Sequence, residues 1–569
     1  MRLNIVKSAN AEQLYIIKSY RVNGKSTSKI FKKLGTMASL LPKFDNDREK
    51  VIAWAKNEAD ALTRAEKEGN LIIPVEFSEG RQLSFGEQNC KAGGYLFLKK
   101  ICGELGLRSI CEFISKKYDF EYDLSKILED LIYARILSPS SKLSSYEYAQ
   151  KLLEPPTYNL HDVYRALDVL DKESEYIQSS IYDGFKTKRN DAILYYDCTN
   201  FFFEIEDESG IRKYGKSKEH RPNPIVQLGM FLDGDGLPLA FTVFSGNENE
   251  QPTLIPLEKR IMDDFKLSKF IVCTDAGLAS EANRRFNSRP GHSYIVTQSL
   301  KVMKDYLKEW ALDTKGWHLN GANEEYDLSE IDEEKHMNSV FHKERWINEN
   351  DFEQRLIVSY SPKYKYYQRE IRNRQVNRAV KIIEKGKSAK TRNPNDPTRF
   401  IDELQLTIDG EIAEKSCITL DTDKISEEER YDGFTAVCTT LEDDITDILK
   451  VNRRRWEIEE SFRIMKTEFK ARPVYVRKDE RIRAHFLTCF LSLLVYRCLE
   501  KKLDEKYTTS EIVKTLKDMN FYKIAGAGYL PEYTRTKITD DLHEKLGFRT
   551  DTEIITEKNM KKIIKMAKK

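Results

Sequence analysis

The spacing of hydrophobic residues along this chain changes from helical to strand-like and back to helical. From about residue 91 to 187, apolar residues recur every three or four positions, which predicts a mostly helical block. Short apolar runs typical of strands follow at 193–197, 225–232, 239–244 and 270–273. An Asp-Gly-Asp-Gly turn joins the second and third runs and so predicts a β-hairpin. A helical stretch near 253–265 separates this hairpin from the last run. A strand, a hairpin, a helix and another strand in this order indicate an α/β core.

Strand-like patterns also occur on both sides of this core. Alternating polar and apolar residues flank Asn23-Gly24, a dipeptide that favours tight hairpin turns, and a charged helix is expected at 46–68. Residues 300–450 change character, because polar and basic stretches separate their short apolar runs. Three of these runs predict strands: 355–360, 412–420 and 434–440.

The most regular amphipathic pattern lies at residues 452–466, which we expect to form one helix. Its apolar stripe repeats at spacings of four, three and four: Ile458, Phe462, Met465 and Phe469. Arg455, Glu459 and Lys466 fall together on the neighbouring flank, since steps of four and seven return to nearly the same face. Such a carboxylate between cations suits a metal-dependent phosphate site, although a solvated Arg–Glu ladder is the alternative.

These patterns divide the chain into segments with different expected structures. We predict a hairpin plus helix, a mostly helical region, the first part of an α/β core, a β-rich insertion with a basic segment, the rest of the core, and a helical basic tail. Their respective bounds are 1–70, 71–187, 188–300, 301–445, 446–500 and 501–569.

Composition narrows the class of protein. Charged residues make up 33% and hydrophobic residues 40%, which is typical of a globular chain with several domains. The nine cysteines form no CxxC pair and read as reduced thiols, so we expect a cytoplasmic protein. The longest apolar run, 486–496, is too short to span a bilayer and predicts a core helix, hence no membrane partner.

The net charge of +2 conceals one strongly basic segment. Residues 363–392 contain eleven Lys and Arg against Glu370 and Glu384, a local charge of +9. Interleaved tyrosines leave two interpretations, an exposed helix or a nucleic-acid surface. On the second interpretation, Lys385 and Lys387 are candidate contacts to the DNA backbone.

Three carboxylates carry the candidate chemistry. Asp197 and Asp275 each end an apolar strand, and Glu459 lies on the later helix. This order is expected of a ribonuclease-H-like core, in which adjacent strand ends bring two aspartates together. Mg²⁺ prefers such oxygen ligands, and two ions can stabilise both the attacking and the leaving oxygen at phosphorus. Taken singly, an Asp at the end of a strand is more often a cap or turn residue, and a Glu on a helix more often pairs with a neighbouring Arg on a solvated face.

The chain resembles the DDE transposases of bacterial insertion sequences, within the IS-four-like group that carries a strand-rich insertion. Three stretches carry the resemblance: 196–200 (Tyr-Asp-Cys-Thr-Asn), 274–277 (Thr-Asp-Ala-Gly) and 455–459 (Arg-Trp-Glu-Ile-Glu). The family's helix signature is Tyr, two residues, Arg, three residues, Glu, six residues, Lys. This chain keeps the Arg, Glu and Lys but has Asn452 in place of the tyrosine. The likeness covers roughly residues 190–500.

The resemblance implies a fold and a set of residue roles. The fold is α/β, a ribonuclease-H-like mixed sheet flanked by helices, with a β-rich insertion and a mostly helical N-terminal region. Asp197, Asp275 and Glu459 are expected to bind two Mg²⁺ ions, for which Mn²⁺ can substitute. Other residues are expected to contact DNA: Arg455, Lys466, Asn452, Trp456, Lys216, His220 and Arg221. Trp456 has a core-anchor alternative, which we favour over base stacking, and the alternative for the residues between 216 and 221 is a solvated loop.

The resemblance also implies an activity and its partners. The expected protein is a cut-and-paste DNA transposase that cleaves at insertion-sequence ends and transfers the 3′-hydroxyl into target DNA. Its partners are then double-stranded DNA, as terminal inverted repeats and target, and a second copy in a synaptic homodimer. The helical region 71–187 is expected to bind the DNA ends, and residues 188–300 and 446–500 to form the catalytic core. Two alternatives stay open, a nuclease that only hydrolyses and a non-catalytic DNA-binding descendant.

Overall fold

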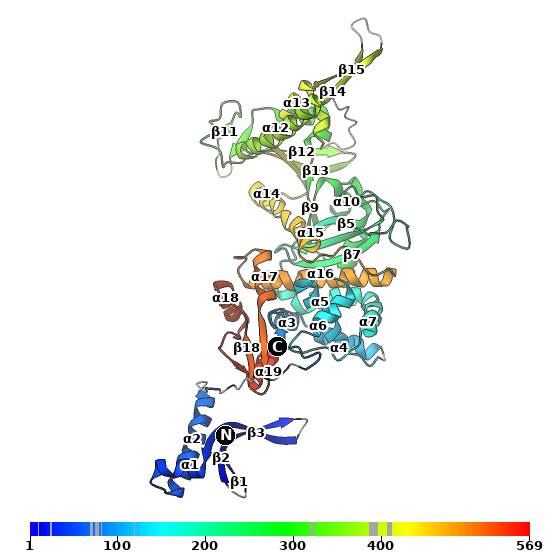
Figure 1. The fold of residues 1–569 in the computed structure, drawn as a ribbon. Helices are drawn as coiled ribbons and strands as arrows, with labels where there is room; N and C mark the ends of the chain where they lie inside the picture. The colour runs from blue at the N-terminus through cyan, green and yellow to red at the C-terminus, as the bar shows by residue number, and fades with distance from the viewer. Residues whose placement is uncertain are drawn as a thin grey trace. The chain divides into compact units, whose positions relative to one another are not determined.

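The computed structural model describes residues 1–569 except 9–10, 23–24, 69–71, 74, 76–78, 81, 83, 119, 320–321, 323, 386–395, 407–411 and 569. The chain divides into two compact units. The first comprises Met1–Cys90, Tyr522–Pro531 and Thr552–Lys561, and the second comprises Lys91–Phe521, Glu532–Asp551 and Lys562–Lys569 (Figure 1). All the predicted site residues lie in the second unit.

A three-stranded antiparallel sheet and a long helix form most of the first unit. The elements are β1 (Arg2–Ser8), β2 (Ala11–Val22), β3 (Lys25–Thr36), α1 (Met37–Leu40) and α2 (Arg48–Glu68). Strands β2 and β3 pair up to Val22 and Lys25, which confirms the predicted hairpin, while its turn at 23–24 lies outside the described residues. Leu14, Val51 and Ala55 are buried between the sheet and the helices.

The second unit begins with the predicted helical block. Its helices are α3 (Tyr95–Glu104), α4 (Leu107–Lys117), α5 (Leu124–Leu137), α6 (Lys142–Ala149), α7 (Leu160–Lys172) and α8 (Ser174–Phe185). The helices begin where the sequence supplies caps: the Asp123 side chain accepts a hydrogen bond from the Lys126 backbone at the start of α5, and Asn159 with Asp162 forms a capping box at α7. The predicted helical structure of this region is confirmed.

Five consecutive strands form one half of a ten-stranded sheet. They are β5 (Ile193–Phe202), β6 (Ile225–Asp233), β7 (Pro238–Ser245), β8 (Phe270–Thr274) and β9 (His292–Gln298). Their spatial order is β7-β6-β5-β8-β9, in which β5–β6 and β6–β7 are antiparallel while β5–β8 and β8–β9 are parallel. This is the topology of a ribonuclease-H-like core, as predicted.

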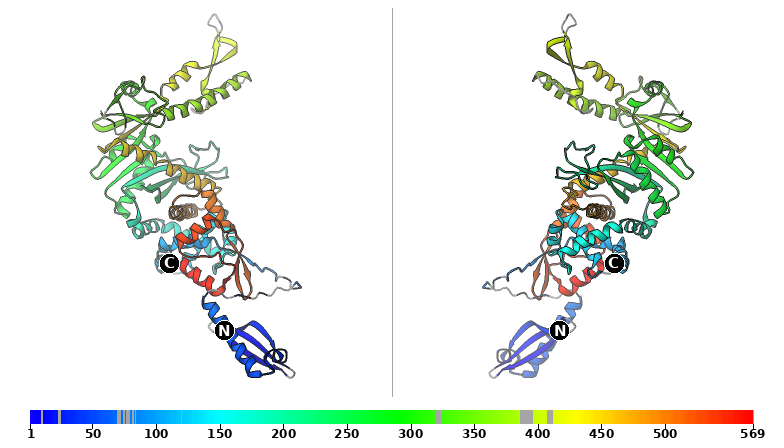
Figure 2. Two further views of the ribbon diagram at one scale, coloured as in Figure 1. Left: turned by 90° about the vertical axis from the view of Figure 1, so that its left-hand side faces the viewer. Right: turned by 90° about the vertical axis from the view of Figure 1, so that its right-hand side faces the viewer.

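Strands of the insertion extend the same sheet beyond β9. They follow in the order β16 (Phe434–Thr439), β13 (Phe352–Tyr360), β12 (Phe341–Glu349), β10 (Trp317–Leu319) and β11 (Glu325–Tyr326), each pair antiparallel. The predicted strands at 355–360 and 434–440 are thus confirmed. The insertion also contains α11 (Asp305–Leu312), α12 (Pro362–Glu384), α13 (Thr422–Glu429) and the paired strands β14 (Ile401–Leu406) and β15 (Ile412–Leu420) (Figure 2).

Helices cover both faces of the core strands. On one face, α9 (Leu254–Asp264), followed in the chain by the short α10 (Glu281–Phe286), buries Leu257 and Ile261 in a cluster with Leu194 and Tyr196 of β5. On the other face, α16 (Asp479–Lys502) packs Phe486 against Phe201 of β5, with ring centroids 4.8 Å apart. Alternate residues of β5 therefore face different helices.

Helix α16 also confirms one prediction about the core. By length and composition alone it could cross a membrane, but 94% of its most apolar window is buried inside the protein. Arg481 and Arg483 pair with Asp168 and Asp171 of α7, which ties α16 to the helical block. It is the core helix that the sequence predicts.

The predicted single helix at 452–466 is wrong, because the chain forms two helices there. Helix α14 (Ile445–Arg453) ends at Arg454, and α15 (Trp456–Thr467) begins after Arg455. Tight turns replace regular helical bonds at the junction: the Glu457 and Ile458 amides donate to carbonyls only three residues earlier. The amphipathic stripe alone does not reveal this break, since its apolar positions all lie in α15 or just after it.

The tail contains strands as well as the predicted helices. Its helices are α17 (Thr509–Asp518), α18 (Lys537–Leu546) and α19 (Glu557–Ala567). Between them lie β17 (Asn520–Ile524), β18 (Gly528–Pro531) and β19 (Ile555–Thr556), and a further short strand, β4 (Cys90–Ala92), precedes the helical block.

Candidate active site

Strand register places Asp197 beside Asp275. Strands β5 and β8 pair in parallel with Tyr195 opposite Cys273, so the same register sets Asp197 level with Asp275. Neighbouring strands lie about 4.8 Å apart, and side chains at one level point to the same face. The expectation that Asp197 ends its strand is wrong, because β5 continues to Phe202 through antiparallel pairing with β6. Asp275 does follow the end of β8 directly.

The environment of Asp197 disfavours its ionised form. Burial raises the pKa of this carboxyl to about 7, and the nearby charge of Asp275 adds to the increase. Lys218 and Arg455 oppose it, since their positive charges favour the carboxylate. Asp275 accepts a hydrogen bond of 3.1 Å from the Leu278 amide and so begins the short helix η4 (Ala276–Leu278). Two adjacent acidic groups of this kind fit a divalent cation, which would remove their repulsion.

Helix α15, which packs against β5, carries the third carboxylate. At its N-terminal end, the charge of Arg455 acts on both Asp197 and Cys273. Towards its C-terminal end, Lys466 Nζ lies 5.5 Å from the centroid of the Phe201 ring. Asp197 precedes Phe201 by about 13 Å along the strand, and Glu459 precedes Lys466 by about 10 Å along the helix. These similar offsets place Glu459 near the level of Asp197.

The Glu459 carboxylate itself pairs with Arg455. Arg455 Nη1 and Glu459 Oε1 are 2.9 Å apart, and the Glu459 side chain is 57% exposed. Over the described parts of the chain, three acidic or histidine ligand atoms lie within 4.8 Å of one another only at Asp540, His543 and Asp551. Asp197, Asp275 and Glu459 thus do not converge to that distance in the described structure.

The apolar stripe of α15 behaves as predicted, but Trp456 does not serve as a core anchor. Ile458, Met465 and Phe469 are fully buried, and Phe462 is 5% exposed. Trp456 is 58% exposed at the first position of the helix. The core-anchor interpretation is therefore wrong, because the tryptophan falls outside the stripe that packs on the sheet.

Asn452 lies near the end of α14, where its side chain contacts the sheet. Its Oδ1 accepts a hydrogen bond of 3.3 Å from the Thr297 hydroxyl of β9, and the Cys273 thiol lies 3.9 Å from the same atom. One residue earlier, the Val451 carbonyl accepts a bond of 3.1 Å from the Tyr195 hydroxyl. These contacts attach the end of α14 to the sheet beneath the carboxylates.

The loop before β6 carries the predicted basic residues. Lys216 and His220 are exposed, and His220 adopts a left-handed backbone conformation with φ of 54°. The guanidinium of Arg221 stacks 4.3 Å from the centroid of the Phe202 ring. The sequence analysis missed Lys218, whose ammonium donates to the Cys198 carbonyl at 2.5 Å. Burial lowers the pKa of Lys218, but the carboxylates of Asp197 and Glu250 outweigh it and the net change is an increase.

Asn200 positions this loop on β5. Its side chain donates to the Lys216 carbonyl at 3.2 Å and accepts from the Lys218 amide at 3.3 Å. Asn200 is 2% exposed, so these bonds are shielded from water. Asn200 lies three residues after Asp197 in the sequence, but only the folded chain shows that it holds the loop.

Lys466 meets a carboxylate that the sequence analysis did not predict. Its Nζ lies 3.6 Å from Glu219 Oε1, and the Arg472 guanidinium forms an ion pair with the same oxygen. Burial lowers the pKa of Lys466, and the negative charge of Glu219 opposes this decrease. Glu219 and Arg472 have no sequence signal that singles them out.

The basic segment of the insertion forms the long helix α12. Several of its cations have partners within the protein: Arg372 is buried and forms two bonds of 2.7 and 2.6 Å with Asp432. Along the described helix and its cap, five exposed cations have no ion-pair partner: Lys363, Arg369, Arg378, Lys381 and Lys385. The predicted contact Lys387 lies outside the described residues. The helix is thus an exposed basic surface, compatible with either of the two interpretations.

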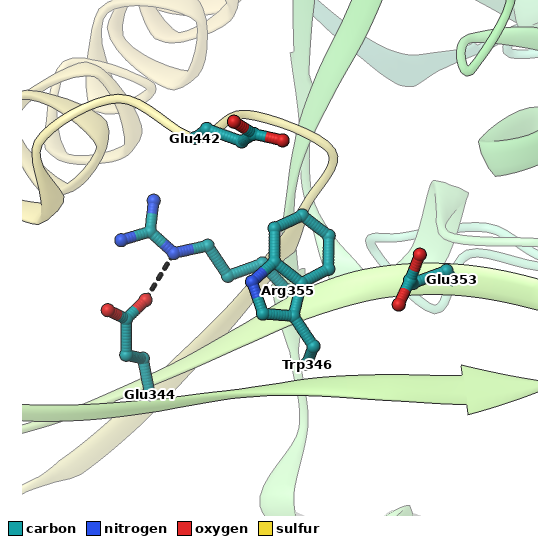
Figure 3. Close-up of a pocket in the computed structure, with 5 residues that line it drawn as sticks. All are labelled: Glu344, Trp346, Glu353, Arg355 and Glu442. Atoms are coloured by element: carbon teal, nitrogen blue, oxygen red, sulfur yellow. Dashed lines mark hydrogen bonds and ion pairs between the residues drawn. The ribbon is translucent and has the colours of Figure 1, made fainter.

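A polar pocket of about 440 Å³ lies on strands β12 and β13 (Figure 3). Its net charge is negative, in contrast to the basic surface of α12. Its lining residues are Glu344, Trp346, Glu353, Arg355 and Glu442. Arg355 pairs with Glu344 and donates to the carbonyls of Leu441 and Asp443, so it holds the loop that leads into α14. Three carboxylates against one guanidinium disfavour a DNA phosphate here.

Comparisons with known proteins agree with this geometry. The family described as "Transposase DDE domain" matches residues 200–495. This range includes Asp275 and Glu459 and begins three residues after Asp197. No curated protein matches the chain.

Two solved structures resemble the chain at low identity. A piggyBac transposase synaptic complex with hairpin DNA has 8% identity and a TM-score of 0.36, with 84% of this chain and 85% of that chain covered. A Mos1 transposase paired-end complex with the left transposon end has 13% identity and a TM-score of 0.13, with coverage of 41% and 64% respectively. The family match, in contrast, spans more than half of the sequence. The chain therefore belongs to the DDE transposase family, and it is a DNA transposase.

Proposed function

We propose that Asp197, Asp275 and Glu459 bind two Mg²⁺ ions that serve DNA cleavage and strand transfer. The main support is the register of β5 and β8, which sets the two aspartates level with each other. The raised pKa of Asp197 further supports a cation site, because a buried carboxyl beside another acid is stabilised by positive charge. When bound, such ions polarise a phosphate and lower the pKa of a coordinated water.

The residues of the chain position DNA around these carboxylates. Arg455 holds Glu459 at 2.9 Å and is placed to exchange this partner for a phosphate once Glu459 turns to the aspartates. Lys218 is placed to stabilise negative charge next to Asp197. Trp456, exposed at the first turn of α15, is available for stacking against an unpaired base at the opened end.

Other surfaces provide sequence-independent contacts and assembly. The exposed cations of α12, including Lys385, are proposed to hold the DNA backbone together with Lys387, Lys216 and His220. Because two transposon ends must be joined, we propose that the protein acts as a homodimer on double-stranded DNA. Its site of action is proposed to be the bacterial cytoplasm, on chromosomal DNA. For Asn452 the contact with Thr297 supports a role in fixing α14 instead.

Glu459→Gln tests the metal-site assignment. The variant should bind a labelled transposon-end duplex almost normally, but it should lose Mg²⁺-dependent cleavage by at least about a thousandfold, as expected when a group that stabilises the transition state is removed. Glu460→Gln is the matched control, since Glu460 lies on the same helix and pairs with Arg463 instead. Cleavage by Glu459→Gln at the rate of Glu460→Gln would refute the assignment.

A strand-transfer assay separates transposition from hydrolysis alone. The wild-type protein is supplied with ends that already carry a free 3′-hydroxyl and with a supercoiled target plasmid. A transposase produces joined products in the presence of Mg²⁺, whereas a hydrolysis-only nuclease gives nicked or linear plasmid without joining.

A further inference from the structure

Glu219 lies between two cations that converge on the end of strand β5. A single oxygen, Glu219 Oε1, serves both Lys466 at 3.6 Å and the guanidinium of Arg472. The side chains are mostly buried, with exposed fractions of 15% for Lys466, 23% for Arg472 and 25% for Glu219. The group therefore forms a partly enclosed polar site at the protein surface.

Aromatic rings fix the cations in place. Lys466 lies over Phe201, while Arg472 and Arg221 lie over Phe202 with centroid distances of 5.0 and 4.3 Å. Such cation–π contacts leave the remaining N–H groups free to bind an anion. Two cations thus pair with one carboxylate, and a third, Arg221, shares the Phe202 ring with Arg472, so the site carries a surplus of positive charge.

The Glu219 carboxylate does not fill this site. One carboxylate oxygen, Oε1, is shared between Lys466 and Arg472, and Arg221 forms no ion pair in the described part of the chain. A phosphate offers more acceptor oxygens than the one that Glu219 supplies, and it matches the fork of an arginine.

The loop that carries Glu219 is anchored to β5 at Lys216 and Lys218, and beyond Lys218 its backbone bonds are local. The amides of Glu219 and Arg221 both donate to the Ser217 hydroxyl at 3.3 Å, and Asn200 holds the loop on the Lys216 side. Glu219 is therefore attached to the site through its ion pairs and not through a regular helix or strand. Its side chain can leave without disrupting the sheet.

We propose that Lys466, Arg472 and Arg221 form a binding site for a DNA backbone phosphate, and that Glu219 occupies this site until DNA displaces it. The proposal rests on the proposed function in one respect, because it takes DNA as the source of the phosphate. It assigns binding roles to Arg472 and Glu219. The expected consequence is that the carboxylate competes with DNA and lowers its affinity.

The test is the affinity of the full-length Glu219→Gln variant for a fluorescently labelled duplex of about 30 base pairs. Removal of the competing charge should tighten binding about tenfold, and it should steepen the dependence of log Kd on log salt by about one unit for the added phosphate contact. Glu204→Gln is the matched control, since Glu204 is exposed and forms no ion pair in the described structure. It removes the same charge and should leave the affinity within twofold of the wild type.

A second pair of variants tests whether the gain passes through Arg472. Arg472→Gln should weaken binding, and the double variant Glu219→Gln/Arg472→Gln should lose most of the tenfold gain. Equal affinity of Glu219→Gln and the wild type would overturn the proposal. Weaker binding by Glu219→Gln would also overturn it, because the carboxylate would then be a support for the cations and not a competitor.

Two further readouts separate this proposal from others. Inorganic phosphate at matched ionic strength should compete with the duplex no better than chloride; strong competition would assign the site to a free anion and overturn the DNA assignment. Cleavage is measured on the same proteins. If Glu219→Gln binds DNA more tightly but the wild type does not cleave, the proposed function is contradicted and the phosphate site is supported. If the wild type cleaves but Glu219→Gln binds DNA with unchanged affinity, the phosphate site is contradicted and the proposed function is supported.

Discussion

Asp197 should make the metal-free protein less stable at neutral and alkaline pH. Its pKa is about 7 in the folded chain against an ordinary value of 3.8. A raised pKa of an acid means that the folded state holds the proton more tightly, so stability is lost as the pH rises from about 4 to 7. Below that window both states are protonated and no loss occurs.

The magnitude follows from this difference. At about 1.4 kcal/mol per pH unit, the ionised carboxyl lowers the free energy of unfolding by about 4 kcal/mol at pH 8 and by about 1.6 kcal/mol at pH 5. Asp197→Asn resembles the protonated form and should recover most of this energy. At about 2 °C per kcal/mol for a large domain, its rise in Tm should be about 5 °C greater at pH 8 than at pH 5.

Differential scanning calorimetry in EDTA measures this difference. Asp263→Asn is the control, because Asp263 is exposed on α9 and its replacement should not change Tm at either pH. Addition of Mg²⁺ at pH 8 should stabilise the wild type and not Asp197→Asn. An equal Tm change at both pH values, or a destabilised Asp197→Asn, would refute the argument that Asp197 is strained by burial and by Asp275.

Three further predictions concern DNA contacts and the insertion. Lys381→Ala with Lys385→Ala should weaken duplex binding and reduce the salt slope by about two, while exposed Lys315→Ala with Lys335→Ala should not; an unchanged slope would mean that α12 is only a solvated surface. Trp456→Ala should keep the wild-type Tm but reduce cleavage by about 5–150-fold, with partial activity in Trp456→Phe; unaltered cleavage would exclude base stacking. Arg372→Met should destabilise the insertion by about 3–5 kcal/mol in urea unfolding, because Asp432 would stay buried without its partner, and Arg372→Met/Asp432→Leu should recover much of it.

Hydrophobic periodicity determined most of the secondary structure. Strands β5 to β8 and helices α3 to α8 appear where period-two or period-3.6 patterns and turn residues predict them, because those patterns directly reflect which side of an element is buried. The helix at 452–466 was an exception. Its apolar stripe lies entirely in α15 or just after it, so nothing in the pattern marks the break at Arg454–Arg455.

Spacing and residue type also identified the candidate carboxylates, but not their surroundings. Asp197, Asp275 and Glu459 follow a recognisable order along the chain, and local sequence is enough to place each on its element. That Asp197 lies inside a longer strand depends on pairing with β6, a contact between residues far apart in sequence. The spacing of the apolar stripe already excludes Trp456, but only the packing of α15 on the sheet shows that its side chain is exposed.

The sequence by itself determined the order of elements, the ribonuclease-H-like core and the three acidic residues, because these depend on local pattern. Only the tertiary structure decided which charges meet. Glu219 lies about 250 positions before Lys466 and Arg472, yet the packing of α15 along β5 brings all three together. Electrostatic interactions act through space over a few ångströms, whereas the sequence records only separation along the chain. The pairing of Glu219 with these cations therefore has no counterpart in any local pattern.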